Sequence, residues 1–445
     1  MWTRPRLAIA VSVGVFLAHL AILWHYAVNV PYWDEWEMLQ PEAFPSGQLS
    51  LDWIFQRHNE HRIVTTKLVH WAFFRLSGWN HVGLVVFNFL FFGLLLLTLT
   101  RMVRRMVPNL PLVALLAFML FLETPLNYEN HVWGFQFQFH FSLLMLCLGI
   151  LMLFDEQQRS GRLLSGALIL VVGAYSFSSG ITSGIATMGV FMGFKALRAF
   201  RAEDASTKRR ELLQLGLASL IAIAGICAAA LGQKRLDVHP EFTLPHQSRF
   251  WVYLTNLVGL GFGFEQRSVL VGALCLLAVV VPSVWLLLRS RLRLSTMQWM
   301  LVAMLAAVAG ALVTITIGRA GFGVSSAKSS RYTEIAFLLV PLAAAVWWSV
   351  LEPWTKARKV ALVVLWTGCL IGSANDFSLK YYQSLHKDRL EGVACARQYY
   401  ANAGDGNCGR LYPGPLAERL DRARQLKLSF VEDILAQQQL VSDQP

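Results

Sequence analysis

Charged residues are scarce in this chain: aspartate, glutamate, lysine and arginine together make up 15% of its 445 residues. A soluble globular domain carries roughly 25% charged residues, so the composition argues against a soluble protein. Hydrophobic residues reach 55%, and apolar runs of about 20 residues, each long enough to cross a hydrocarbon core, recur from end to end. The sequence therefore predicts an all-α polytopic membrane protein.

Motifs for nucleotides and for structural zinc are also missing. The chain contains no Walker A sequence, no GxSxG, no HExxH, no glycine-rich dinucleotide fingerprint and no CxxC pair. The first of these absences excludes an ATP-driven pump. A nucleotide-sugar donor is not expected either, because the predicted cytoplasmic loops are too short to form a nucleotide-binding domain.

The predicted membrane-spanning segments number about eleven. They are 7–28, 81–100, 109–123, 140–154, 162–177, 181–199, 211–231, 268–288, 297–317, 332–351 and 358–374. Basic residues cluster in alternate connections between these segments, and positively charged loops stay in the cytoplasm. The N-terminus is therefore expected in the cytoplasm, with an uncleaved first helix, and the C-terminus outside. These loops account for the net charge of +12, so membrane lipids are the expected surroundings and no nucleic-acid partner is expected.

Four connections are expected on the outer side of the membrane. They are 29–80, 124–139, 232–267 and 318–331. Residues 1–374 would form a transmembrane domain with interfacial helices in the first outer loop, and residues 375–445 would form a small outer tail. Cys395 and Cys408 lie thirteen positions apart in that tail and are predicted to form a disulfide in an oxidising compartment.

An acidic stretch follows the first apolar segment directly. Residues 31–37 read PYWDEWE, so that Asp34 and Glu35 lie between two tryptophans where a membrane helix is expected to emerge into water. Acidic side chains are costly at a bilayer surface and usually persist there for a function. A carboxylate half-buried among aromatic rings has a fixed direction and can have a raised pKa, which suits a general base. We expect Asp34 to be that base and Glu35 to contact the acceptor or a metal ion.

The pair formed by Asp34 and Glu35, just after the first of many membrane helices, resembles the pattern of the GT-C superfamily of integral-membrane glycosyltransferases. Those enzymes take a sugar from a polyprenyl-phosphate carrier and use a carboxylate of the first outer loop as base. The resemblance implies a transmembrane catalytic domain in the bacterial inner membrane, with a periplasmic active site. It would move a sugar to a glycan, lipid or protein acceptor, such as a surface glycan or a pilin subunit, by a single displacement that inverts the sugar C1.

Polar residues in the first two outer loops are candidates for contacting the donor phosphate or the sugar. The predicted residues are His58, Glu60, His61, Arg62, Glu129 and His131. Further partners for sugar hydroxyls and ring faces are expected at Gln136, Gln138, His140, Phe135, Phe137 and Phe139. The alternative is a polar and aromatic belt at the membrane interface. A divalent metal held by Asp34, Glu35 and Glu129 is left open, although the spacing matches no zinc pattern, and no other cofactor is predicted.

The fourth outer loop carries the expected anion site. Its candidate residues are Arg319, Lys328, Arg331 and Tyr332. Arg331 is expected to begin a membrane helix, so that its guanidinium and the helix N-terminus would both face the carrier phosphate. The alternative is a charged loop that only anchors the end of the helix.

Two other functions remain open. A flippase or transporter for lipid-linked sugars would keep ionisable residues inside the spans, whereas these spans are nearly free of charge. An O-antigen ligase or polysaccharide polymerase would rely on outer histidine and arginine, and His58, His61 and Arg331 fit that type. The need for Asp34 or Glu35 would separate the glycosyltransferase from the ligase.

Overall fold

The computed structural model describes residues 4–40, 43, 49–233, 237, 239–264, 269–375, 377–402 and 404–442, which form helices and no β-sheet. The first helices are α1 (Arg4–Tyr26), α2 (Leu51–Phe55), α3 (Val64–Ser77), α4 (His81–Met106), α5 (Leu112–Met119), α6 (Tyr128–Val132), α7 (Phe137–Leu153), α8 (Ser160–Ala174), α9 (Ser178–Arg201) and α10 (Ala205–Ala230). The later helices are α11 (Ser248–Gly261), α12 (Val269–Ser290), α13 (Thr296–Arg319), α14 (Ser330–Phe337), α15 (Leu339–Val350), α16 (Thr355–Gly372), α17 (Lys380–Asn402), α18 (Ala417–Gln425) and α19 (Ser429–Ser442). The 3-10 turns are η1 (Trp33–Leu39), η3 (Leu120–Glu123), η4 (Pro125–Asn127), η5 (Gly134–Gln136), η6 (Ala320–Phe322), η7 (Val324–Lys328) and η8 (Ser373–Asn375).

Nine helical segments among the described residues are long and apolar enough to cross a membrane, which confirms a polytopic membrane protein. They are Arg4–Tyr26, His81–Met106, Leu112–Val132, Gly134–Leu153, Ser178–Arg201, Ala205–Ala230, Val269–Ser290, Thr296–Phe322 and Ser330–Val350. The predicted spans 162–177 and 358–374 correspond to α8 and α16, which are not among the nine. α8 is only 15 residues long, and α16 carries three basic residues near its start.

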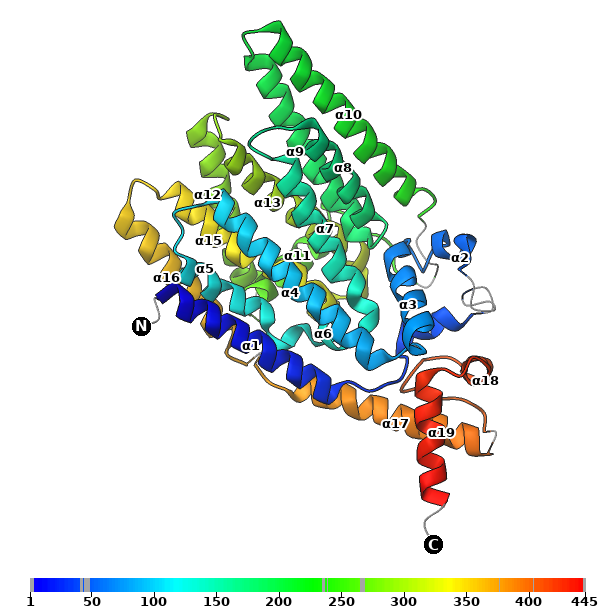
Figure 1. Ribbon diagram of the computed structural model, residues 1–445. Helices are drawn as coiled ribbons and strands as arrows, with labels where there is room; N and C mark the ends of the chain where they lie inside the picture. The colour runs from blue at the N-terminus through cyan, green and yellow to red at the C-terminus, as the bar shows by residue number, and fades with distance from the viewer. Residues whose placement is uncertain are drawn as a thin grey trace.

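The bundle has two different ends (Figure 1). The turns from α9 to α10, from α12 to α13 and from α15 to α16 lie toward the end that holds the N-terminus. Basic residues are concentrated in or beside these turns, so we call this the basic end. The short helices α2, α3, α18 and α19 lie at the opposite end, which we call the loop end. The alternating charge of the sequence thus becomes a difference between the two ends of the bundle.

Two hydrophobic cores hold the chain together. The larger core packs the long helices against one another. The smaller core lies at the loop end and combines the first loop with the tail, since Trp36, Trp53 and Trp79 share it with Leu411 and Phe430. The ring of Trp36 meets that of Phe430 edge-on at 5.7 Å. The loop and the tail, far apart in sequence, therefore fold as one packed unit.

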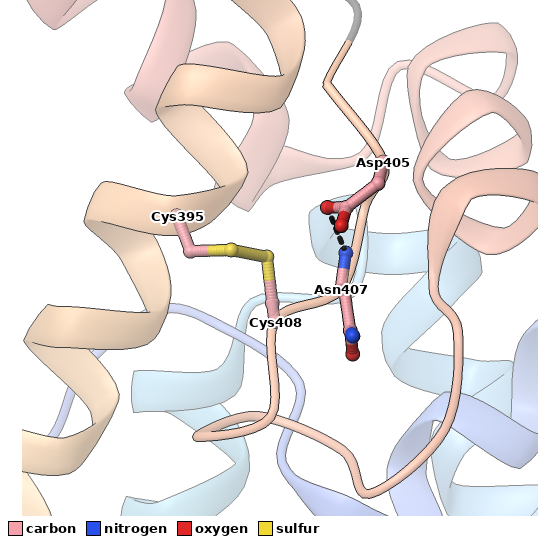
Figure 2. The surroundings of a disulfide bond; sticks show 4 residues. All are labelled: Cys395, Asp405, Asn407 and Cys408. Atoms are coloured by element: carbon pink, nitrogen blue, oxygen red, sulfur yellow. Dashed lines mark hydrogen bonds between the residues drawn. A yellow bond between two sulfur atoms is a disulfide. The ribbon is translucent and has the colours of Figure 1, made fainter.

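Helix α17 belongs to both cores. Tyr382 and Leu385, near its start, are buried in the larger core, whereas Ala396 is buried in the smaller one. Farther along α17, Cys395 forms a disulfide with Cys408 in the loop before α18, as Figure 2 shows. This confirms the predicted disulfide. It links the loop before α18 covalently to α17, whose first turns pack in the larger core.

Candidate active site

A cavity of about 290 Å³ lies at the loop end of the bundle. Its wall comes from η1, the turn at 58–61, the connection from α6 to α7, the end of α13 and the start of α14. Eight of the twelve predicted site residues line it. They are Asp34, His58, Glu60, His61, Glu129, Arg319, Arg331 and Tyr332. The fold thus brings the first, second and fourth predicted outer loops to one place.

Asp34 lies in η1 and is half-buried in the cavity wall. Its Oδ2 is 3.5 Å from Nε2 of His58. Burial by itself raises the pKa of Asp34, but the contact and charge of His58, with the charge of Arg331, hold that pKa below its usual value. Asp34 is therefore ionised at neutral pH and able to accept a proton. The structure favours a lowered pKa here, in contrast to the raised one that its aromatic neighbours suggested.

The turn at 58–61 presents three predicted residues to the cavity. The N–H of His58 donates to the carbonyl of His61 over 2.8 Å, and the N–H of His61 donates back over 3.2 Å. Asn59 has a left-handed backbone with φ 52°, which asparagine tolerates better than most residues. Burial lowers the pKa of His61 to about 3, so its ring is neutral. Neither ring nitrogen of His61 makes a hydrogen bond within the described residues.

Glu60 joins the first loop to two later parts of the chain. Its carboxylate accepts a hydrogen bond of 3.2 Å from Nη2 of Arg319, at the end of α13, and also contacts Nδ1 of His239. The Arg319 guanidinium lies 5.6 Å from the ring centre of Phe322. His239 was not predicted, because nothing in the sequence of the third outer loop distinguishes it from the polar residues around it and only the fold brings it to Glu60.

Glu129 and Arg331 form a third acid–base pair of the cavity. Oε2 of Glu129 lies 3.8 Å from Nε of Arg331 and also accepts a hydrogen bond from the hydroxyl of Ser330. Arg331 is the second residue of α14, which confirms that it begins a membrane helix. Its guanidinium lies 6.0 Å from the ring centre of Trp133. An anion at this place would meet a guanidinium, a helix N-terminus and an aromatic wall.

The rest of the wall combines aromatic rings with amide groups. Trp133 and Phe135 stack with their ring centres 5.6 Å apart. Oε1 of Gln136 and Oε1 of Gln138 are buried and make no hydrogen bond to any described residue. Buried polar atoms are normally paired, so these oxygens are suited to the hydroxyls of a ligand. Trp133 was missed by the sequence analysis, although a tryptophan between a polar turn and glutamines was the available signal.

Glu35, the second residue of the predicted catalytic pair, does not line the cavity. Its carboxylate accepts hydrogen bonds from the N–H of Tyr32 over 2.8 Å and of Phe135 over 3.1 Å, and it lies 3.3 Å from Nδ1 of His81. Burial by itself raises the pKa of Glu35, but the charge of His81 and its hydrogen bond bring the pKa below its usual value. Glu35 fastens η1 to the α6–α7 connection and to α4.

Three other predicted residues also lie outside the cavity wall. Arg62 donates to the carbonyls of Ala229 and Leu231, each over 2.9 Å, and so binds the end of α10. Lys328 is exposed at the end of η7. His131 is fully buried among the spans.

A second polar cluster lies within the membrane-spanning part. Nε2 of His19 is 2.7 Å from the hydroxyl of Tyr382, and Nδ1 of His131 is 3.3 Å from the same hydroxyl. Nε2 of His140 is 3.1 Å from Oε1 of Glu334, and the rings of His131 and His140 are 6.0 Å apart. All five side chains are buried. We call these residues the buried network; the sequence analysis missed it because each segment supplies only one or two of its members.

The cavity offers no evident metal site. Within the described residues, no group of three or more His, Cys, Asp or Glu side chains is arranged to hold a metal ion. Of the three suggested ligands, Glu35 is directed into the protein, while Asp34 and Glu129 contact His58 and Arg331. The carboxylates of the cavity are thus matched with cationic or imidazole partners from the chain itself.

The fold and the cavity define a polytopic membrane protein with a polar, aromatic-lined site at one end of its helical bundle. Comparison with known proteins assigns it no family: no family model and no curated protein matches the chain. Its function has to be argued from the chemistry of the cavity.

Proposed function

We propose that the protein is a membrane glycosyltransferase of the GT-C type, which moves a sugar from a polyprenyl-phosphate carrier to an acceptor. The observation that carries this proposal is the composition of the single cavity wall around Asp34. That wall combines an ionised carboxylate, two arginines, and imidazole and amide groups without partners among the described residues. A base, cations for a leaving phosphate and groups for sugar hydroxyls are the parts that such a transfer needs.

The reaction follows from the placement of these groups. The acceptor hydroxyl attacks C1 of the sugar, and its proton passes to Asp34 while the new C–O bond forms. The bond from C1 to the phosphate oxygen breaks, and its electron pair stays on the carrier phosphate. Arg331 and Arg319 stabilise that charge, since a guanidinium binds phosphate through two hydrogen bonds. Asp34 then releases its proton to water, and the single displacement inverts C1.

The two ends of the bundle support an outward-facing site. Positive turns favour the cytoplasm, so the loop end would face the periplasm of a bacterial inner membrane, with the N-terminus inside. The disulfide between Cys395 and Cys408 fits an oxidising compartment. A topology reporter fused after Arg210 should read cytoplasmic, and one at the C-terminus should read periplasmic. The reverse pattern would contradict the side assigned to the cavity.

The direct test is a transfer assay on purified protein in liposomes with synthetic polyprenyl-phosphate sugars. Asp34→Asn keeps the size of the side chain but cannot accept a proton, so turnover should fall roughly 10²–10⁴-fold. Asp52→Asn is the matched control, because Asp52 is an exposed carboxylate of the same loop outside the cavity wall. Parental turnover in Asp34→Asn would favour instead a ligase that works through His58 and Arg331.

A second candidate function, transport of a lipid-linked sugar, is favoured by the buried network. Ionisable side chains inside membrane spans often mark transport or proton pathways. His19, His131, His140 and Glu334 are such residues, and they connect α1, α6, α7 and α14. Movement of a fluorescent polyprenyl-phosphate sugar between leaflets, without transfer to an acceptor, would support this candidate. The composition of the cavity places it second.

A further inference from the structure

The residue before Asp34 has a backbone conformation that needs support. Trp33 has φ 48°, in the left-handed region that bulky residues rarely adopt. Such a conformation persists only where the surrounding structure holds it, and it often occurs beside functional groups. The direction of the Asp34 carboxylate depends on this backbone, so whatever holds Trp33 also orients Asp34.

The support comes from the tail. The N–H of Trp33 donates a hydrogen bond of 2.7 Å to the carbonyl of Leu411. At the other end of η1, Glu37 accepts a hydrogen bond from the hydroxyl of Tyr412 and lies 3.5 Å from Nη2 of Arg419. η1 is therefore held at both ends by residues that follow α17.

The tail loop that carries these groups is itself fixed to α17. Leu411 donates its N–H to the carbonyl of Cys408 over 2.8 Å, and Cys408 is bonded to Cys395 (Figure 2). Arg410 adds ion pairs of 3.1 Å to Asp388 and 3.0 Å to Glu391, both in α17. The disulfide and these ion pairs set the position of the Leu411 carbonyl relative to α17.

Helix α17 is in turn anchored beside the cavity and among the spans. Arg389 donates a hydrogen bond of 3.0 Å to the carbonyl of Val132, and its guanidinium lies 4.9 Å from the ring centre of Tyr32. Tyr382, one part of the buried network, contacts His19 in α1. A continuous set of contacts thus runs from the membrane-spanning helices through α17 and the disulfide to Trp33.

We propose that Leu411, Tyr412 and Arg419 are positioning residues for Asp34, and that the disulfide between Cys395 and Cys408 holds them in place for catalysis. This inference rests on the proposed glycosyl transfer. Loss of the disulfide lets Trp33 relax, and Asp34 then leaves its contact with His58. The chemical step slows, whereas donor binding at Arg331 and Glu129 is preserved, because no tail residue lines the cavity.

The test compares the double variant Cys395→Ser/Cys408→Ser with the parental protein and with Cys227→Ser. Cys227 is a free, exposed cysteine of α10 and serves as the matched control. In the double variant, kcat should fall about 10–100-fold, the cost of a misplaced catalytic group, while KM changes less than about threefold. Amide hydrogen exchange at Trp33 should accelerate. Exchange at Val64, whose N–H donates to the carbonyl of Tyr175 outside η1 and the tail, should not.

A second variant with a smaller change keeps the proposal testable if the cysteine double variant does not fold. Tyr412→Phe/Arg419→Gln leaves the disulfide intact and removes only the two tail groups that contact Glu37. This variant should also lower kcat and accelerate amide exchange at Trp33. The single variant Arg419→Lys, which keeps Tyr412, should recover part of the lost kcat.

Two results would overturn the positioning role. Unchanged exchange at Trp33 in both variants would show that the tail does not hold η1, whatever the protein's activity. Faster exchange with parental kcat would show that the tail holds η1 without orienting Asp34, and the proposed transfer would stand. A parental protein that transfers no sugar would refute the proposed function, and the exchange measurements would still decide whether the tail holds Trp33.

Discussion

The cavity at the loop end and the buried network contain similar side chains in different surroundings. In the cavity, Asp34 in η1 and Glu129 in α6 remain partly exposed and lie near side-chain atoms without hydrogen-bond partners among the described residues. In the network, His140 and Glu334 lie on membrane helices, are buried and pair with each other. The same residue types thus line an open cavity in one region and lie packed between helices in the other.

Burial of polar groups inside a membrane protein therefore does not by itself identify a site. Buried atoms without a hydrogen-bond partner occur in both regions, Nε2 of His131 among them, but those of the cavity wall border a space that can hold a ligand. The comparison would fail if the network proved essential for activity or if the cavity proved dispensable.

After Asp34, the largest effect is expected at Arg331, in the cavity. Arg331→Ala should lower kcat/KM roughly 10²–10³-fold, the usual loss when a group that stabilises developing charge is removed. Arg331→Lys should retain part of the activity, because the charge stays but the two parallel hydrogen bonds do not. Lys328→Ala is the control, since Lys328 is exposed and outside the wall. Full parental activity in both Arg331 variants would move the phosphate site elsewhere.

A substitution in the buried network should lower the stability of the protein and leave the rate of sugar transfer unchanged. Glu334→Gln removes the charge opposite His140 and should lower the unfolding free energy by about 1–3 kcal/mol, measured by thermal unfolding in detergent. Sugar transfer at low temperature should stay near the parental rate. Glu211→Gln is the matched control for the loss of a buried, paired carboxylate, because Glu211 forms such a pair with Lys195 at the basic end, far from the cavity. Lost transfer with unchanged stability in Glu334→Gln would favour the transport function.

Glu35 should behave as a structural group despite its place beside Asp34. Its folded-state pKa lies below the unfolded one, so the ionised carboxylate stabilises the fold above the unfolded pKa. This stabilisation is lost as the pH falls through the folded-state pKa. Glu35→Gln should therefore cost about 1–3 kcal/mol at neutral pH, and less in acid. A full loss of turnover with parental stability would return Glu35 to the catalytic pair.

The smallest effect is expected at His61. If its free ring nitrogens bind a sugar hydroxyl, His61→Ala should lower kcat/KM about 10-fold, the value of one or two hydrogen bonds. Because the pKa of His61 is lowered to about 3, the ring stays neutral and this ratio should be constant between about pH 5 and pH 8. A ratio that changes across this range would show that His61 titrates during the reaction.

Much of the fold could be predicted because membrane spans carry a strong local signal. Length and hydropathy located the long helices, and basic residues separated the two ends. The predicted span 162–177 lies within three residues of α8, but the helix breaks around Pro125 could not be placed well, since packing against neighbours sets them. The core that the first loop and the tail share could not be predicted, because the sequence around Trp36 gives no sign of its contact with Phe430.

The candidate site was predictable where several polar residues stand together in sequence. Asp34 and the 58–61 turn were found in this way, and the structure places them around one cavity. The sequence could not show that the side chain of Asp34 lines the cavity while that of Glu35 is buried in the protein, because this depends on the turn geometry of η1. His239 was missed for another reason: its only signal is its pairing with Glu60, which arises from the tertiary fold.

The hydrogen bond between Trp33 and Leu411 has a consequence for how the protein is made. The ribosome adds roughly 5–20 residues per second, so the carbonyl that completes η1 appears about 20–80 s after Trp33 itself. Throughout that interval the nascent chain inserts helix after helix with an unfinished first loop. For the proposed transferase this means that a chain becomes active only after its last segment has been made and its disulfide has formed.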